Sequence, residues 1–136
     1  MKEPVVGMEV TFSKTVAEAD VYAFAGISGD FSPNHVDQEY MSATRYGQRI
    51  AHGVLSMAFM STCSSKLIES LGNPPTVSYG YDHVRFIKPV FIGDTLTARY
   101  TVSSVDEEDQ RSISDVKVFN QHGDLVSVAK HILKRV

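Results

Sequence analysis

Two carboxylates and a histidine lie within eight positions of a stretch without hydrophobic periodicity, "GDFSPNHVD" at residues 29–37. Asp30 and His35 could act as a general acid–base pair, because an imidazole with an ordinary pKa of about 6.5 exchanges protons in either direction near neutral pH. The same residues could instead form an Asx-type turn before Pro33, with the histidine in solvent. A metal site on His35 and Asp37 is a third alternative, although one cysteine and scattered histidines supply few further ligands.

A second run, "RIAHGVL" at residues 49–55, places His52 and Gly53 where a long apolar segment begins. In a helix, the first amides have no intrahelical acceptor and lie at the positive end of the dipole. The Gly53 amide could therefore donate to a substrate oxygen, a contact typically worth about 10²–10³ in rate. Glycine costs about 1 kcal/mol of helix stability relative to alanine. Its presence at position 53 could be explained by the room it leaves for a ligand atom or by tight packing against a neighbouring element. His52 could orient its neighbours or transfer a proton.

Upstream of these runs the pattern predicts a strand and then an amphipathic helix. Residues 8–13 alternate loosely, as in a strand. The sequence "TVAE" matches a capping box in which Thr15 and Glu18 satisfy each other's backbone amides, so we expect the helix to begin there. Gly26 and Gly29 are expected to end it. The acid-rich loop therefore begins where a helix stops.

Downstream, residues 50–71 are apolar on nearly all faces and predict a long buried helix that ends at "GNPP", residues 72–75. The rest of the chain is rich in β-branched and aromatic residues, and it predicts four strands, at 76–86, 96–102, 111–120 and 125–136. Meandering strands form an antiparallel sheet, and one apolar helix needs such a sheet to cover it. We therefore expect an α+β fold in which an antiparallel β-sheet wraps around a long central helix.

The bulk composition bounds the class of protein. At 136 residues the chain is expected to form a single domain, residues 1–136, and 43% hydrophobic with 21% charged residues is ordinary for a globular protein. A net charge of −3 gives no electrostatic footprint for nucleic acid, and no apolar run approaches the roughly 20 residues of a membrane span. The single cysteine, Cys63, excludes an internal disulfide. With no signal peptide visible, we expect a cytoplasmic protein.

The two runs together resemble the signature of the MaoC-like, (R)-specific enoyl-CoA hydratase family, whose members have the hotdog fold. That signature has an aspartate, a proline, a histidine and a second aspartate, followed by an aromatic–glycine pair and an Ile-Ala-His-Gly run. The matching residues are Asp30, Pro33, His35, Asp37, Tyr46, Gly47, Ile50, Ala51, His52 and Gly53. The segment "RFIKPVFIGDTL" at 85–96 also resembles the family, so the similarity covers nearly the whole chain.

The resemblance implies a role for each matching residue. Asp30 and His35 would be the catalytic dyad that holds a water against the substrate's double bond, and Gly53 and His52 would bind the thioester end. Ser61, two helical turns further on, falls where related hydratases have a serine in the active-site network. The reaction would be reversible syn hydration of a trans-2-enoyl-CoA to an (R)-3-hydroxyacyl-CoA. It would need no metal or redox cofactor, since the thioester itself acidifies C2. The partner molecule would be an acyl-CoA, and the expected assembly is a homodimer.

Two departures from the family pattern bear on the substrate rather than on the reaction class. Ser32 replaces an asparagine of many members, and Asn34 replaces an aliphatic residue and is expected to alter pocket polarity or acyl preference. Other functions stay open: an acyl-CoA thioesterase on the same fold, a dehydratase acting on a carrier protein, and a non-catalytic acyl-CoA or acyl-carrier binding module. Lys88 or Arg85 could meet CoA phosphates or could be a solvated strand end.

Overall fold

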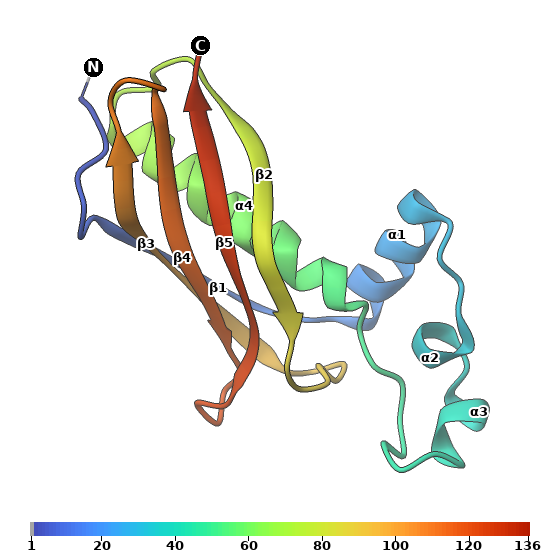
Figure 1. Cartoon of the computed structure of the whole chain (residues 1–136). Helices are drawn as coiled ribbons and strands as arrows, with labels where there is room; N and C mark the ends of the chain where they lie inside the picture. Colours follow the sequence, from blue (N-terminus) through green and yellow to red (C-terminus); the bar gives the residue numbers. More distant parts are fainter. Residues whose placement is uncertain (1) are drawn as a thin grey trace.

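The structure, a computed structural model, describes residues 2–136 and places a long helix against a five-stranded sheet, with three shorter helices projecting beyond them (Figure 1). In chain order the elements are β1 (Glu9–Thr15), α1 (Glu18–Ser28), α2 (Pro33–Val36), α3 (Gln38–Ser42), α4 (Gly53–Ser70), β2 (Thr76–Phe86), β3 (Thr95–Asp106), β4 (Arg111–Phe119) and β5 (Leu125–Arg135). The α+β arrangement expected from the sequence is confirmed, as is the hotdog fold that the resemblance implies.

The strand order in the sheet is β1-β3-β4-β5-β2, and every neighbouring pair is antiparallel. β3, β4 and β5 meander as predicted. β2 lies at the far edge beside β5, with Tyr81 opposite His131. The expectation of a simple meander is therefore wrong for β2. The segment that follows β2 does not form a hairpin with it. In that segment Phe91 forms an isolated antiparallel bridge with Ile50, which lies just before α4.

α4 lies along one face of the sheet (Figure 1). Its buried side chains recur at helical spacing and include Leu55, Phe59, Met60, Cys63 and Leu67. The residues predicted to share one face of β3 are buried against it: Leu96, Ala98, Tyr100 and Val102. The sheet does not enclose the helix all round as expected, since Val54 is 52% exposed and Ala58 and Ser61 are exposed along the same stripe. One face of α4 is open in the single chain.

The predicted capping box at the start of α1 is wrong. β1 continues through Thr15, whose hydroxyl lies 2.7 Å from the Thr95 hydroxyl on β3. Because strand pairing engages Thr15, α1 begins only after Ala17, and the Asp20 carboxylate accepts the Ala17 amide at 2.8 Å. Glu18 instead pairs with Arg49 at 3.1 Å.

α1, α2 and α3 project from the body formed by the sheet and α4 (Figure 1). Gly29 ends α1 in the left-handed conformation, at φ 80°, as predicted, whereas Gly26, also expected to end the helix, lies within it. The segment that returns to α4 ties the projection to the body, because the Ile50 amide donates to the Asn34 carbonyl at 3.0 Å and the Ala51 amide to the Val90 carbonyl at 2.7 Å. Among residues 2–136, no helix is long and apolar enough to cross a bilayer.

Candidate active site

The acid-rich stretch folds into a turn followed by a single helical turn. Asp30 Oδ1 accepts the Ser32 amide at 3.2 Å, which is the Asx-type turn given above as one alternative, although His35 is not in solvent as that alternative supposed. Pro33 then opens α2, at a position where its missing amide leaves no donor unpaired. This short helix carries His35 inward, where the residue is 8% exposed. The turn and the acid–base pair are therefore compatible, because the second oxygen of Asp30 stays available.

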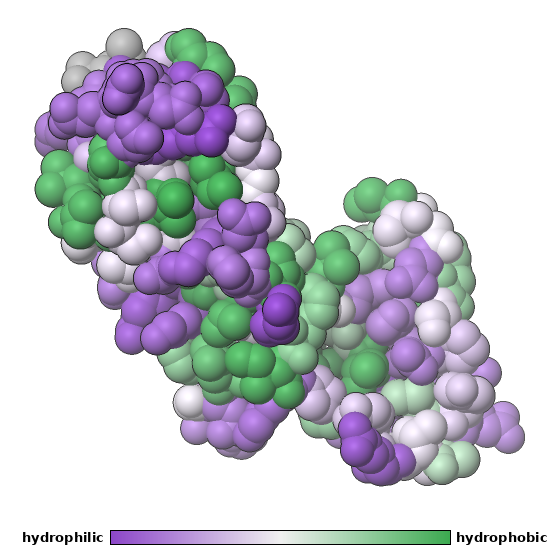
Figure 2. Space-filling model, viewed as in Figure 1, coloured by the Kyte–Doolittle hydropathy of each residue, from purple (hydrophilic) through white to green (hydrophobic). Residues whose placement is uncertain are grey.

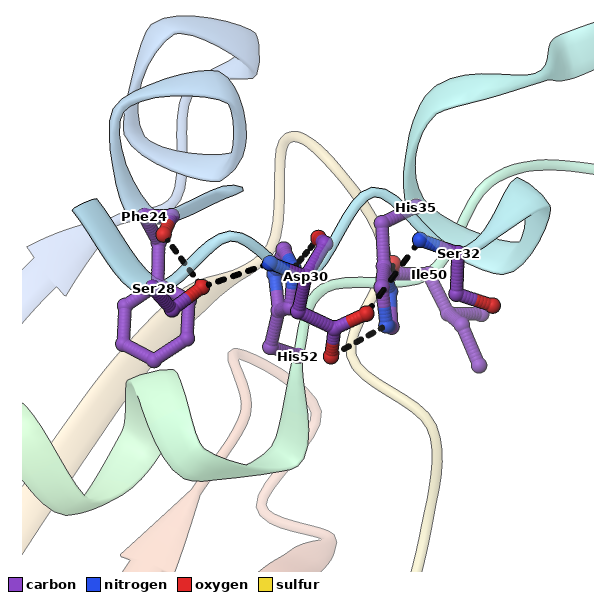
Figure 3. Close-up of polar contacts among 7 residues, drawn as sticks. All are labelled: Phe24, Ser28, Asp30, Ser32, His35, Ile50 and His52. Carbon is purple, nitrogen blue, oxygen red and sulfur yellow. Dashed lines mark hydrogen bonds and ion pairs between the residues drawn. The ribbon is translucent and has the colours of Figure 1, made fainter. Parts of the chain in front are cut away.

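Asp30 and His35 face each other across a narrow gap (Figure 3). Oδ2 of Asp30 lies 3.9 Å from Nε2 of His35, and Nδ1 of His35 lies 2.8 Å from the Ile50 carbonyl oxygen. A carbonyl only accepts, so in the neutral ring Nδ1 carries the proton and Nε2 presents a lone pair toward Asp30. Two acceptors thus face each other at a distance that suits a bridging water. The Asp30 side chain is 53% exposed, so solvent reaches this gap.

His52 is held by the backbone of the same turn. Its Nε2 lies 2.9 Å from the Asp30 carbonyl oxygen, so the same reasoning places its proton on Nε2. Its ring stacks on His35, with centroids 3.7 Å apart and planes 26° apart, and lies 4.7 Å from the Phe24 ring. With one nitrogen committed to a carbonyl and the ring enclosed, this geometry favours the orienting role for His52 over proton transfer.

The geometry does not suit the metal alternative. Asp30, His35 and His52 bring ligand atoms within 4.8 Å of one another. However, Nδ1 of His35 and Nε2 of His52 each face a backbone carbonyl oxygen, at 2.8 and 2.9 Å, and the two rings stack on one another. Asp37 is committed elsewhere, since its carboxylate accepts the Tyr40 amide at 2.9 Å and caps α3. The metal alternative on His35 and Asp37 is therefore not formed.

A cavity of about 250 Å³ opens between His35, the start of α4 and the facing ends of β2 and β5. Its lining includes His35, Gly53, Ser56, Phe86, Lys88 and Ser127. α4 begins at Gly53, so the Gly53 amide has no intrahelical acceptor. A methyl group on Gly53 would lie 2.8 Å from the Phe86 ring, closer than real contacts allow. Tight packing against Phe86 therefore explains why this position is a glycine.

Ser61 is not brought to the dyad within one chain. It lies on the open face of α4, eight residues after Gly53, which is about 12 Å along a helix axis. Ser61 instead acts on Tyr81: burial raises the pKa of the Tyr81 hydroxyl, and the Ser61 hydroxyl opposes that rise. The network role that the resemblance implies for Ser61 is therefore not formed by the described residues of a single chain.

The structure also shows where Asn34 and the two basic residues, Arg85 and Lys88, lie. Asn34 is exposed and lies outside the cavity lining, so the expectation that it alters pocket polarity is wrong. The Arg85 guanidinium donates to the neighbouring Val84 carbonyl, whereas Lys88 lines the cavity with its Nζ 3.6 Å from Asp124. Of the two, Lys88 is the one at the site.

Sequence reasoning missed three residues that shape the cavity. Phe86 lies in the segment at 85–96 that resembles the family but was given no role there, and Ser127 comes from β5, where no local pattern marks it. Ser56 lies one turn into α4, where a polar residue on an otherwise buried helix face was the available signal.

Comparisons with known proteins agree with this geometry. The profile of the family described as MaoC like domain matches residues 2–123. An (R)-specific enoyl-CoA hydratase of Rhodospirillum rubrum is 38% identical over 102 residues, which are 75% of this chain and 68% of that protein. A protein of the same name from Aeromonas caviae is 30% identical over 129 residues, which are 95% and 93% of the two chains. The unliganded R-hydratase PhaJ1 from Pseudomonas aeruginosa superposes with a TM-score of 0.84 at 32% identity, covering 97% of this chain and 82% of that one.

Proposed function

The chain belongs to the MaoC-like domain family of dehydratases and hydratases, and from this membership we propose that it is an (R)-specific enoyl-CoA hydratase. Such a hydro-lyase reversibly adds water across the double bond of a trans-2-enoyl-CoA. The observation that carries the proposal is the 3.9 Å gap between Asp30 Oδ2 and His35 Nε2, beside the start of α4. An acid–base pair next to an oxyanion donor is the equipment this reaction needs.

The dyad is proposed to hold the reacting water. An oxygen about 2.8 Å from each acceptor fits between Asp30 and His35 and donates one hydrogen to each. As the water oxygen bonds to C3, the dyad takes one of its protons, and the dyad returns a proton to C2 from the same face. The net change is one new C–O bond and one new C–H bond in place of the double bond. Because the pair is coupled, the two residues are treated as one acid–base unit.

The Gly53 amide is proposed to bind the thioester oxygen. Hydration places negative charge on this oxygen as the enolate forms, and an amide at the positive end of α4 stabilises that charge. One such donor is typically worth about 10²–10³ in rate. His52 contributes by holding the Asp30 carbonyl, which fixes the backbone that carries one half of the dyad.

The activity test separates hydration from thioester hydrolysis. Purified protein is mixed with crotonyl-CoA, and loss of the enoyl thioester absorbance is followed alongside release of free thiol. The proposal predicts loss of the enoyl absorbance without thiol release. Thiol release without hydration would make the protein a thioesterase. Absence of both signals across several chain lengths would indicate a binding module and contradict the proposal.

The proposed enzyme acts as a homodimer paired through β2. β2 is an edge strand of the sheet, and four apolar side chains on it and just after it are 47–56% exposed: Val77, Tyr79, Phe86 and Ile87. Figure 2 shows apolar surface gathered where the body meets the projecting helices. A second copy along β2 would cover these side chains. Light scattering should give twice the 15.0 kDa chain mass, and a monomer at micromolar concentration would contradict the pairing.

The proposed location is the cytoplasm. Cys63 is fully buried, and burial raises its pKa to about 11, so it remains a thiol. A chain whose one cysteine is a buried thiol suits a reducing compartment.

A further inference from the structure

A second cavity lies at the far end of α4 from the dyad. Its volume is about 350 Å³, against about 250 Å³ for the cavity beside His35. α4 begins at Gly53 and ends at Ser70, so about 26 Å of helix axis separates the two ends. Figure 1 shows this end of α4 near the end of β5, opposite the projecting helices. Its lining includes none of the four apolar side chains that the proposed dimer covers.

The floor of this second cavity is apolar. Leu67 of α4, Leu71 just after it and Leu133 of β5 border the cavity, and they are only 2%, 4% and 4% exposed. Further apolar residues complete the walls: Pro4, Ile68, Pro74 and Val105. A volume of roughly 300–1,000 Å³ with a mostly apolar lining is typical of a pocket that binds a small molecule. The floor therefore suits an aliphatic chain.

One arginine at the rim has a partner that a ligand can replace. The Arg135 guanidinium pairs with the Glu3 carboxylate, and the two side chains are 22% and 64% exposed. Glu3 is brought there because the preceding amide, that of Lys2, donates to the Leu71 carbonyl at 2.9 Å. An exposed ion pair of this kind shifts an equilibrium by only about fivefold or less. A ligand carboxylate can therefore take the place of Glu3 and accept two N–H groups of the guanidinium.

The other charged residues of the rim are held elsewhere or lie in solvent. Nε of Arg111 lies 2.6 Å from Oδ2 of Asp109. Oδ1 of Asp106 accepts the Asp109 amide at 3.1 Å within the β3–β4 turn, and Glu107 is exposed. Among the described residues that line the cavity, Arg135 is thus the cation best placed for an anionic ligand.

We propose that this cavity binds an aliphatic carboxylate, whose chain lies on the leucine floor and whose carboxylate pairs with Arg135 in place of Glu3. The ligand class is a free fatty acid of medium length. Octanoate has ten non-hydrogen atoms, and at about 30 Å³ for each water-sized group it needs about 300 Å³, which the cavity provides. The site is additional to the proposed hydratase reaction and uses none of its residues.

The experiment measures octanoate binding to the purified protein by isothermal titration calorimetry at neutral pH, where the acid is ionised. Octanoate should bind once per chain with a Kd of about 1 mM or below. 1-Octanol has the same chain without the charge and should bind about tenfold more weakly, because hydrogen bonds to charged groups are the stronger kind. Hexanoate, two methylenes shorter, should also bind about tenfold more weakly.

Two variants test the assignment of the rim in opposite directions. Arg135→Gln removes the cation and should weaken octanoate binding by about tenfold or more. Glu3→Gln removes the competing carboxylate and should tighten octanoate binding, by up to about fivefold. Because Glu3 is exposed, the second variant tests the site even if Arg135→Gln does not fold.

The matched controls are Arg99→Gln and Glu9→Gln. Nε of Arg99 lies 3.5 Å from the Glu9 carboxylate, so this is also an exposed pair between a strand arginine and a glutamate near the start of the chain, but neither residue lines the cavity. Both controls should bind octanoate as the wild type does. Asp30→Asn should also keep wild-type binding, since Asp30 belongs to the other end of α4.

Three results would overturn the proposal: no octanoate binding by the wild type, equal binding of octanoate and 1-octanol, or an affinity that neither Arg135→Gln nor Glu3→Gln changes. Loss of binding in Asp30→Asn would place the ligand at the dyad and would overturn it too. Because binding is measured directly, none of these results depends on hydratase activity, which the crotonyl-CoA assay tests separately.

Discussion

Replacing Gly53 by alanine tests how the start of α4 is built. The new methyl group would lie 2.8 Å from Cγ and Cδ2 of Phe86 and 3.1 Å from Cδ1, so the ring must move. Overpacking of this kind costs about 1–3 kcal/mol, while alanine recovers about 1 kcal/mol of helix propensity. The free energy of unfolding, measured in urea, should therefore fall by about 1 kcal/mol. Because Phe86 lines the cavity, kcat/KM for crotonyl-CoA should also fall, by about tenfold or more.

The double variant Gly53→Ala/Phe86→Ala decides why the glycine is required. Without the ring there is no clash, so alanine at 53 should leave stability equal to or above that of Phe86→Ala alone. The amide is still present, and kcat/KM should return to within about tenfold of Phe86→Ala. The packing explanation would be refuted if the double variant recovered stability but had a kcat/KM about 100-fold below that of Phe86→Ala. The glycine would then be needed because the substrate contacts it directly.

Three further predictions follow from the buried and paired groups. Asp30→Asn and His35→Gln should each lower kcat by about 10²–10⁴-fold with the melting temperature nearly unchanged, and wild-type rates in both would exclude the dyad. His131 is fully buried, and burial lowers its pKa to about 4. In the unfolded chain this histidine has its ordinary pKa of about 6.5 and so binds the proton more tightly. The free energy of unfolding is therefore greatest above pH 6.5 and falls by about 3 kcal/mol as the pH drops from about 6.5 to 4. Urea titrations at several pH values should show this fall for the wild type, and a fall of equal size in His131→Gln would contradict the assignment. Cys63, with its pKa raised to about 11, should resist a thiol reagent in the native protein and react once unfolded, whereas fast native labelling would show that the core opens.

The sequence predicts the elements of this fold well where local pattern decides them. The alternation of Leu96, Ala98, Tyr100 and Val102 identifies the inner face of β3, and Gly29 marks the end of α1. It fails where a distant partner decides. Thr15 reads as a helix cap, but strand pairing with Thr95, eighty residues away, takes its hydroxyl.

For the candidate site too, the sequence predicts the residues set by local pattern and not those set by distant partners. Four residues of the site could be picked out from the sequence because they lie in two short runs, one that forms a turn and one that begins a helix: Asp30, His35, His52 and Gly53. Whether Asp30 forms a turn or faces His35 could not be decided from the sequence, because one of its oxygens accepts the Ser32 amide and the other lies 3.9 Å from Nε2 of His35. The cavity walls contributed by β2 and β5 depend on β2 crossing to the far edge of the sheet, which no local pattern specifies.

If Asp30 and His35 deliver water and a proton to one face of the double bond, the stereochemistry of the product records it. The experiment is hydration of crotonyl-CoA in deuterium oxide, with the configurations at C2 and C3 of the product read by NMR. We expect a single (R)-3-hydroxybutyryl-CoA with deuterium and hydroxyl added on the same face. An (S) product, anti addition or a mixture at C2 would contradict delivery by this dyad.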